Sequence, residues 1–287
     1  MLGINTNVAS LTAQKNLSGS GIGLNNSIAR LSSGLRVNSA KDDAAGLAIA
    51  ERMQAQIRGF DVAGRNANDG ISLLQVADGA MGKMTDNLQR MRELAVQAKN
   101  GTLNDTDRVN LNREYTELAN EVDRIVTGST FNGNNLFDAA NQTLSFQVGT
   151  GNATTDTLEL NLTDDGLSTG NDLTTILTGA AADIQANLGS ITDVANATTA
   201  IDTLDASIDA ITGIRAVVGA GQSRLEQVAA FADTSSTNLQ AARGRIMDAD
   251  FAKETANLTR SQILQQAGTA MLAQANQLPN NVLSLLQ

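Results

Sequence analysis

The chain has 287 residues, enough for about two domains. Acidic residues outnumber basic ones 30 to 20, and the net charge of −10 argues against nucleic acid and anionic membranes as main partners, because both need a basic face. Histidine, cysteine and tryptophan are absent, which excludes zinc sites of the usual nitrogen and sulfur ligands, Ser-His and Cys-His nucleophiles, and disulfides.

The N-terminal segment has the apolar spacing of an amphipathic helix. Leu17, Leu24 and Leu31 lie seven residues apart, as one position of a heptad repeat does. Three glycines between residues 19 and 23 each weaken a helix by about 1 kcal/mol, so we expect the helix to be discontinuous there.

The next helix is predicted to start at a capping box formed by Ser39 and Asp42. It carries a heptad seam whose intervals alternate between three and four: Leu74, Ala77, Met81, Met84, Leu88, Met91, Ala95 and Ala98. Asn100-Gly101 predicts its end. A shorter helix is predicted from about residue 105, with one apolar stripe made of Leu111, Tyr115, Leu118, Val122 and Ile125.

The period of the apolar pattern then changes to two, which predicts a β-hairpin on either side of the polar segment 149–156. The alternating apolar residues are Leu144, Phe146 and Val148, then Leu158, Leu160 and Leu162. Residues 163–193 are rich in Thr, Asp, Gly and Ala and show the weakest pattern, so we interpret them as a small outer excursion.

Two further helices are predicted in the C-terminal part. The longer one has apolar residues seven apart without a miss: Leu204, Ile211, Val218, Leu225, Ala232, Leu239 and Ile246. The last one repeats this step at Leu264, Met271, Leu278 and Leu285. Gly268, Ala275 and Val282 flank that stripe and would let a second helix approach closely, and Pro279 is expected to end or bend the helix.

Both chain ends are neutral and amphipathic in an otherwise acidic protein. The segment 261–287 has no charged residue, and its Gln and Asn residues make it too polar for lipid. A partner helix is favoured over a membrane-surface helix, which carries Lys and Arg on its polar face. Residues 1–35 have too few large apolar side chains to offset their conformational entropy, so we expect the ends to become ordered on assembly.

No motif points to catalysis, a metal or a cofactor. The glycines between residues 19 and 23 lack the spacing of a phosphate-binding loop and follow no strand. The segments 164–166 and 248–250 lack the spacing of a calcium loop. Asp42 and Asp43 are interpreted as charges that complement a helix dipole.

Several long strings in the chain resemble the signatures of bacterial flagellins, in the family's order and polarity. They are INTNVASLTAQ (4–14), RLSSGLRVNSAKDDAAGLAIA (30–50), LQRMRELAVQ (88–97), TFNGNNLF (130–137), RIMDADFAKE (245–254) and SQILQQAGTAMLAQANQLPNNVLSLL (261–286). The resemblance covers about residues 1–165 and 195–287.

The resemblance implies a mainly α fold, in which long antiparallel coiled-coil helices from both chain ends are joined by one β-hairpin and a small mid-chain insert. It implies an inner terminal domain of residues 1–42 and 248–287 and a core domain of residues 43–162 and 195–247. Residues 163–194 would be a short variable outer segment, so the chain resembles a short flagellin with reduced outer domains.

The function implied by the resemblance is that of a subunit that self-assembles into the helical filament of the flagellum, for motility. Implied partners are further copies of the chain, an export chaperone on the terminal helix, and the filament cap and hook-junction proteins. Export would be unfolded, without a cleavable signal peptide, to an extracellular filament. The expected assembly residues are Leu17, Leu24, Leu31, Leu264, Met271, Leu278 and Leu285.

LQRMRELAVQ also resembles the flagellin segment recognised by Toll-like receptor 5 of animal hosts. Gln89, Arg90 and Glu93 lie off the heptad seam and are expected to point outward, with Glu114 at the corresponding place on the next helix. Leu94 lies beside the seam and is expected at its rim, where it could anchor a partner.

Two other classes of protein are weaker alternatives. A hook–filament junction protein or a secretion-apparatus component would share only weak similarity at the chain ends. A metalloprotease in the outer insert, as in some flagellins, needs H-E-x-x-H, and the chain has no histidine.

Overall fold

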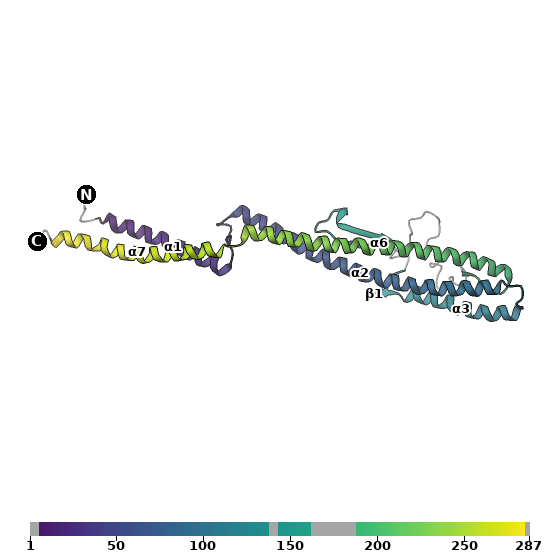
Figure 1. The fold of residues 1–287 in the computed structure, drawn as a ribbon. Coiled ribbons are helices and arrows are strands. Elements are labelled where there is room, and N and C mark those ends of the chain that lie inside the picture. Colours follow the sequence, from purple (N-terminus) through teal and green to yellow (C-terminus); the bar gives the residue numbers. More distant parts are fainter. Residues whose placement is uncertain (1–5, 138–142, 162–187, 285–287) are drawn as a thin grey trace. The chain divides into compact units, whose positions relative to one another are not determined.

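The computed structural model describes residues 6–137, 143–161 and 188–284 (Figure 1). The long helices are α1 (Val8–Ser33), α2 (Ala44–Ala98), α3 (Asp105–Gly128), α6 (Val194–Met247) and α7 (Phe251–Ser284). Contacts group the chain into two compact units, which we name the terminal unit (residues 1–57 and 237–287) and the central unit (residues 58–236). The predicted mainly α fold, with long helices from both chain ends and a β-hairpin, is confirmed.

In the terminal unit, α1 lies beside α7 and runs antiparallel to it (Figure 1). Near the start of α1, the Asn7 side-chain amide donates a 2.8 Å hydrogen bond to the Ala275 carbonyl. Further along, a Cβ placed on Gly268 would lie 3.2 Å from Leu17 Cδ1. The small residues of α7 therefore allow the close approach that the sequence predicts at Gly268.

One expectation about helix α1 is wrong, and one of the two alternatives for Pro279 is excluded. Helix α1 runs without a break through Gly19, Gly21 and Gly23, because packing against a partner helix outweighs intrinsic propensity. A Cβ on Gly23 would already lie 3.4 Å from Ser261 Oγ of α7. Pro279 does not end helix α7, which continues to Ser284.

Two connecting segments pair where the terminal helices meet α2 and α6. The Arg36 amide donates to the Met247 carbonyl at 2.6 Å, and the Ala249 amide donates to the Gly34 carbonyl at 2.9 Å. Gly34 ends α1 in the left-handed region, with φ of 70°, which favours glycine. A small apolar core lies beneath this junction, made of Val37, Ala50 and Met247.

The predicted capping box is displaced by one residue. Helix α2 begins at Ala44, and Asp43 caps it by accepting a 2.8 Å hydrogen bond from the Gly46 amide. Asp42 instead accepts 3.0 Å hydrogen bonds from the Ser39 amide and hydroxyl, which closes a turn before the helix. Adjacent aspartates can both accept such bonds, and the one nearer the helix is the cap.

In the central unit, α2 lies beside α3 and α6 (Figure 1). The predicted heptad seam of α2 from Leu74 to Ala98 is confirmed, since each of its residues is at most 1% exposed. Helix α2 ends at Ala98, as predicted. Arg108 of α3 donates to the carbonyls of Ala98 and Asn100 at 3.0 and 3.2 Å, so it satisfies carbonyls that the end of α2 leaves open.

Helix α6 runs antiparallel to α2 within this unit. Arg215 Nε lies 2.8 Å from Asp78 Oδ1, and the Ser236 hydroxyl donates to Asp61 Oδ1 at 2.9 Å. The predicted stripe of α6 is buried to 2% exposure or less at five positions: Leu204, Ile211, Val218, Leu225 and Ala232.

The predicted β-hairpin is confirmed as β3 (Thr143–Gln147) paired antiparallel with β4 (Thr157–Asn161), with η2 (Thr154–Asp156) in the connection. It packs on α2 and α6 at two glycines: a Cβ on Gly70 would lie 2.9 Å from the Phe146 ring, and one on Gly221 would lie 2.5 Å from Leu160. The expected outer segment lies mostly outside the described residues.

A second small hairpin was not predicted. Strands β1 (Thr130–Phe131) and β2 (Asn134–Asn135) pair across a two-residue turn. Asn132 and Gly133 form this turn with φ of 51° and 82°. Asn-Gly between short strands is the strongest local hairpin signal, so this hairpin could have been predicted from the Asn132-Gly133 pair.

Candidate assembly and recognition surfaces

An apolar groove runs along α1 and α7 in the terminal unit. Its lining includes Val8, Leu17, Leu264, Gly268 and Met271. Among the described residues that line it, Lys15 alone carries a charge. The groove therefore offers a partner a mainly apolar surface with one charged side chain among its described lining residues.

Large apolar side chains of α1 and α7 are unusually exposed. Each of the following is between 48% and 66% exposed: Val8, Leu11, Ile22, Ile28, Phe251, Ile263, Leu264 and Met271. Single exposed apolar residues are ordinary, but a concentration of them on one pair of helices marks an interaction surface.

The structure brings some of the expected assembly residues together. Leu17, Leu24 and Leu31 are half-buried on α1. Leu264 and Met271 are exposed, at 53% and 64%, and line the groove with Leu17. The side chain of Leu278 and the whole of Leu285 lie outside the described residues. Helix α7 meets α1 through the small residues Gly268 and Ala275, so Leu264 and Met271 remain free to contact another molecule.

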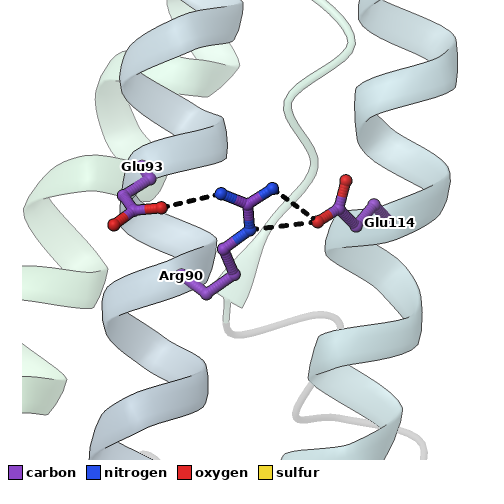
Figure 2. A network of polar contacts seen from close by, with 3 residues as sticks. All are labelled: Arg90, Glu93 and Glu114. Atoms are coloured by element: carbon purple, nitrogen blue, oxygen red, sulfur yellow. Dashed lines mark hydrogen bonds and ion pairs between the residues drawn. The ribbon is translucent and has the colours of Figure 1, made fainter.

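Arg90 of α2 is the centre of a polar network that reaches α3 (Figure 2). Its Nε and Nη2 donate to Glu114 Oε1 at 3.0 and 2.9 Å, and its Nη1 donates to Glu93 Oε2 at 2.8 Å. The hydrogen bond to Glu93, followed by the one to Glu114, raises the pKa of the Arg90 guanidinium. Arg90 and Glu114 are about half exposed and Glu93 is 66% exposed, so the network presents charges of both signs on the surface.

The expected position of Leu94 is wrong. Its side chain is 1% exposed and belongs to the core of the central unit, together with the adjacent Ala95. Helix α2 packs against both α3 and α6, so it buries a stripe wider than a two-helix seam. Gln89, in contrast, is exposed beside Arg90, as expected.

A second ion pair links the same part of α2 to α6. Arg92 Nη2 donates to Asp205 Oδ2 at 3.2 Å, and Arg92 Nε donates to Asp205 Oδ1. Hydrogen bonding from Arg92 holds the pKa of the Asp205 carboxyl below its usual value. Ion pairs on both sides of α2 therefore help to align it with α3 and α6.

Within residues 6–137, 143–161 and 188–284, no group of three or more acidic side chains is arranged to hold a metal ion. No helix in the described part of the chain is long and apolar enough to cross a membrane.

These features define a class: a long helical protein whose paired chain ends carry an exposed apolar groove. Comparison with known sequences narrows the class. Residues 4–142 match the model of the bacterial flagellin N-terminal helical region, and residues 201–286 match that of the bacterial flagellin C-terminal helical region. The chain belongs to the bacterial flagellin family, and it is a structural subunit of the flagellar filament.

Individual relatives agree in length as well as in sequence. The chain is 46% identical over 287 residues to a flagellin of Halalkalibacterium halodurans, covering 99% of both chains. It is 40% identical over 289 residues to the flagellar filament 33 kDa core protein of Treponema phagedenis, again covering 99% of both. Both alignments span nearly the whole of each chain, so these relatives are about as long as this chain, which is a short flagellin.

A solved structure assigned as a flagellar hook-associated protein of Vibrio parahaemolyticus has a similar fold, with a TM-score of 0.55 and 15% identity. The match covers 72% of this chain and 100% of that chain. This likeness concerns the fold alone, and the filament role rests on the sequence comparisons.

Proposed function

We propose that the groove between α1 and α7 is the surface through which subunits contact one another in the filament. The observation that carries this proposal is the exposure of Leu264 and Met271 in an apolar groove of the paired chain ends. Burying each such side chain contributes about 1.5–3 kcal/mol, and every subunit of a helical polymer repeats the contact. The proposed contact residues are Leu17, Leu24, Leu31, Leu264, Met271, Leu278 and Leu285.

Removal of the terminal helices tests this role. A chain without residues 1–35 and 251–287 keeps the central unit, which has its own apolar core. We expect it to be a helical monomer that does not extend filament seeds. Electron microscopy of seeded samples distinguishes long tubular filaments, expected for the full chain, from the discrete oligomers expected of a junction protein. Normal filaments from the truncated chain would contradict the proposal.

We also propose that α7 is held by an export chaperone before secretion, through the exposed stripe that includes Leu264 and Met271. An exposed apolar helix face needs cover in a concentrated solution. The chain would then leave the cell unfolded, meet the hook-junction and cap proteins, and refold in an extracellular filament. Titration calorimetry of the chaperone with the full chain tests this, and Leu264→Glu is expected to weaken binding about tenfold. Unchanged affinity would contradict it.

The exposed network around Arg90 supports a proposal of recognition by Toll-like receptor 5. Gln89, Arg90, Glu93 and Glu114 would form the contacted surface, since mixed charges and an arginine suit a protein interface. Leu94 would instead support this surface from the core.

A receptor-reporter assay tests this recognition proposal. Monomer is expected to stimulate and intact filament is not, because the same face would pack between subunits. Arg90→Ala should lose potency with unchanged helicity, and equal potency of the two folded monomers would contradict the assignment. The matched control Arg113→Ala removes an exposed arginine from α3 and should keep full potency.

We infer a structural and not an enzymatic role. The sequence lacks the residues of most nucleophilic and zinc-dependent sites, and the described residues present an exposed apolar groove. The absence of hydrolytic turnover with peptide and ester substrates checks this inference.

A further inference from the structure

One methionine of the chain differs sharply from the others in its surroundings. Met81, Met84 and Met91 are 0% exposed in the core of the central unit, and Met247 is 5% exposed in the terminal unit. Met53 is half-buried on α2. Met271 is 64% exposed and lines the apolar groove. Met1 lies outside the described residues.

Exposure decides which thioether a hydroperoxide reaches. The sulfur attacks the terminal peroxide oxygen, the O–O bond breaks, and the sulfur is oxidised to a sulfoxide while hydrogen peroxide is reduced to water. Buried methionines react only when the core opens, so their reaction is slow in the folded chain. Met271 is therefore the thioether most open to this chemistry among the described residues.

Oxidation of Met271 makes the groove more polar at a position that would contact a neighbouring subunit. A sulfoxide replaces a flexible apolar side chain with a polar one whose oxygen needs a hydrogen-bond donor. Ala267 and Gly268 lie one turn before Met271 on the same lining and have no side-chain donor. Covering Met271 with a neighbouring molecule would remove water from the polar sulfoxide oxygen, which costs free energy that the thioether does not cost.

We propose that Met271 is an oxidation site that controls polymerisation: its sulfoxide leaves the monomer folded and blocks its addition to the filament. This inference rests on the proposed role of the groove in assembly. In the filament the neighbouring subunit would cover Met271, so peroxide would oxidise Met271 faster in the free monomer than in the polymer. The reaction is reversible, because methionine sulfoxide reductases restore the thioether.

The test uses the full chain and dilute hydrogen peroxide. Trypsin releases residues 261–287 as one peptide with a single methionine, because no Lys or Arg follows Arg260. Mass spectrometry of this peptide reports Met271 directly, and the peptides of Met81, Met84 and Met91 serve as internal controls. Seeded polymerisation gives the critical concentration of the same samples, and circular dichroism gives their helicity.

The expected result is at least a tenfold higher critical concentration for oxidised wild type, equal to about 1.4 kcal/mol, with unchanged helicity. Met271→Leu conserves volume and cannot be oxidised, so it should polymerise equally well before and after peroxide. Met53→Leu is the matched control, and after peroxide it should lose polymerisation as wild type does. Treatment with methionine sulfoxide reductase should restore polymerisation of the oxidised protein. The thiol reductant that this enzyme needs leaves the chain otherwise unchanged, because the chain has no cysteine.

Two results would overturn the inference. One is protein fully oxidised at Met271 that polymerises at the wild-type critical concentration. The other is Met271→Leu protein that loses polymerisation after peroxide as wild type does. A different result would contradict the role of the groove in assembly: normal polymerisation of Leu264→Glu protein that has not been treated with peroxide.

Discussion

The Tyr115 hydroxyl donates a 2.6 Å hydrogen bond to the backbone carbonyl of Leu188, the first described residue after the mid-chain segment. Three residues further on, the Ile191 amide donates to Asn112 Oδ1 of α3 at 2.9 Å. Leu188 and Ile191 are at most 1% exposed. Helix α3 thus holds the segment ahead of α6 through hydrogen bonds at Leu188 and Ile191.

The first prediction concerns alkaline pH. Burial raises the pKa of the Tyr115 hydroxyl, so the folded chain keeps it protonated while the unfolded chain ionises it near the usual value of 10.0. Stability should therefore fall as the pH rises above about 10. Absorbance at 295 nm reports this group alone, because the chain has one tyrosine and no tryptophan. Ionisation should coincide with unfolding; ionisation at the usual pKa with native helicity would contradict it.

Tyr115→Phe is the matched variant. It leaves the buried Leu188 carbonyl without its donor, so the free energy of unfolding at neutral pH should fall by about 1–3 kcal/mol. The difference between wild type and variant should shrink above pH 10, since the variant has no phenol to ionise. Urea unfolding at pH 7 and pH 11 measures both effects.

Two glycines of α6 should respond to the same substitution with opposite signs. A Cβ on Gly219 meets nothing within 4 Å, whereas one on Gly221 would lie 2.5 Å from Leu160 of the β-hairpin. Gly219→Ala should raise the free energy of unfolding by about 0.5–1 kcal/mol through helix propensity. Gly221→Ala should lower it by about 1 kcal/mol or more, because Leu160 must move. Equal effects in thermal unfolding would refute the packing of β4 on α6.

Leu94 and Arg90 should separate stability from recognition. Leu94→Ala creates a cavity in the core of the central unit and should cost about 2–5 kcal/mol, measured by urea unfolding. Arg90→Ala removes only exposed contacts and should change stability little. If Leu94→Ala were as stable as wild type, the side chain would be at the rim after all.

Periodicity was sufficient to predict much of this fold. The seam from Leu74 to Ala98 and the stripe from Leu204 to Ala232 repeat without interruption, and each is buried as its spacing requires. The β3–β4 hairpin followed from strict alternation on both sides of a polar segment.

Other features depend on tertiary contacts that no local pattern contains. Leu94 is buried because α2 meets two helices, and its spacing alone does not reveal the second one. The cap of α2 depended on which of two adjacent aspartates lies nearer the helix.

The most direct test of the central claim, that the α1–α7 groove joins subunits, is the critical concentration for seeded polymerisation of Leu264→Glu. Leu264 is 53% exposed, so the monomer should keep its helicity while a charge enters the groove. Gln262→Glu adds the same charge at an exposed position of α7 that does not line the groove. We expect Leu264→Glu to polymerise at least tenfold less readily than wild type and Gln262→Glu to stay near wild type. Wild-type critical concentration for folded Leu264→Glu would contradict the account.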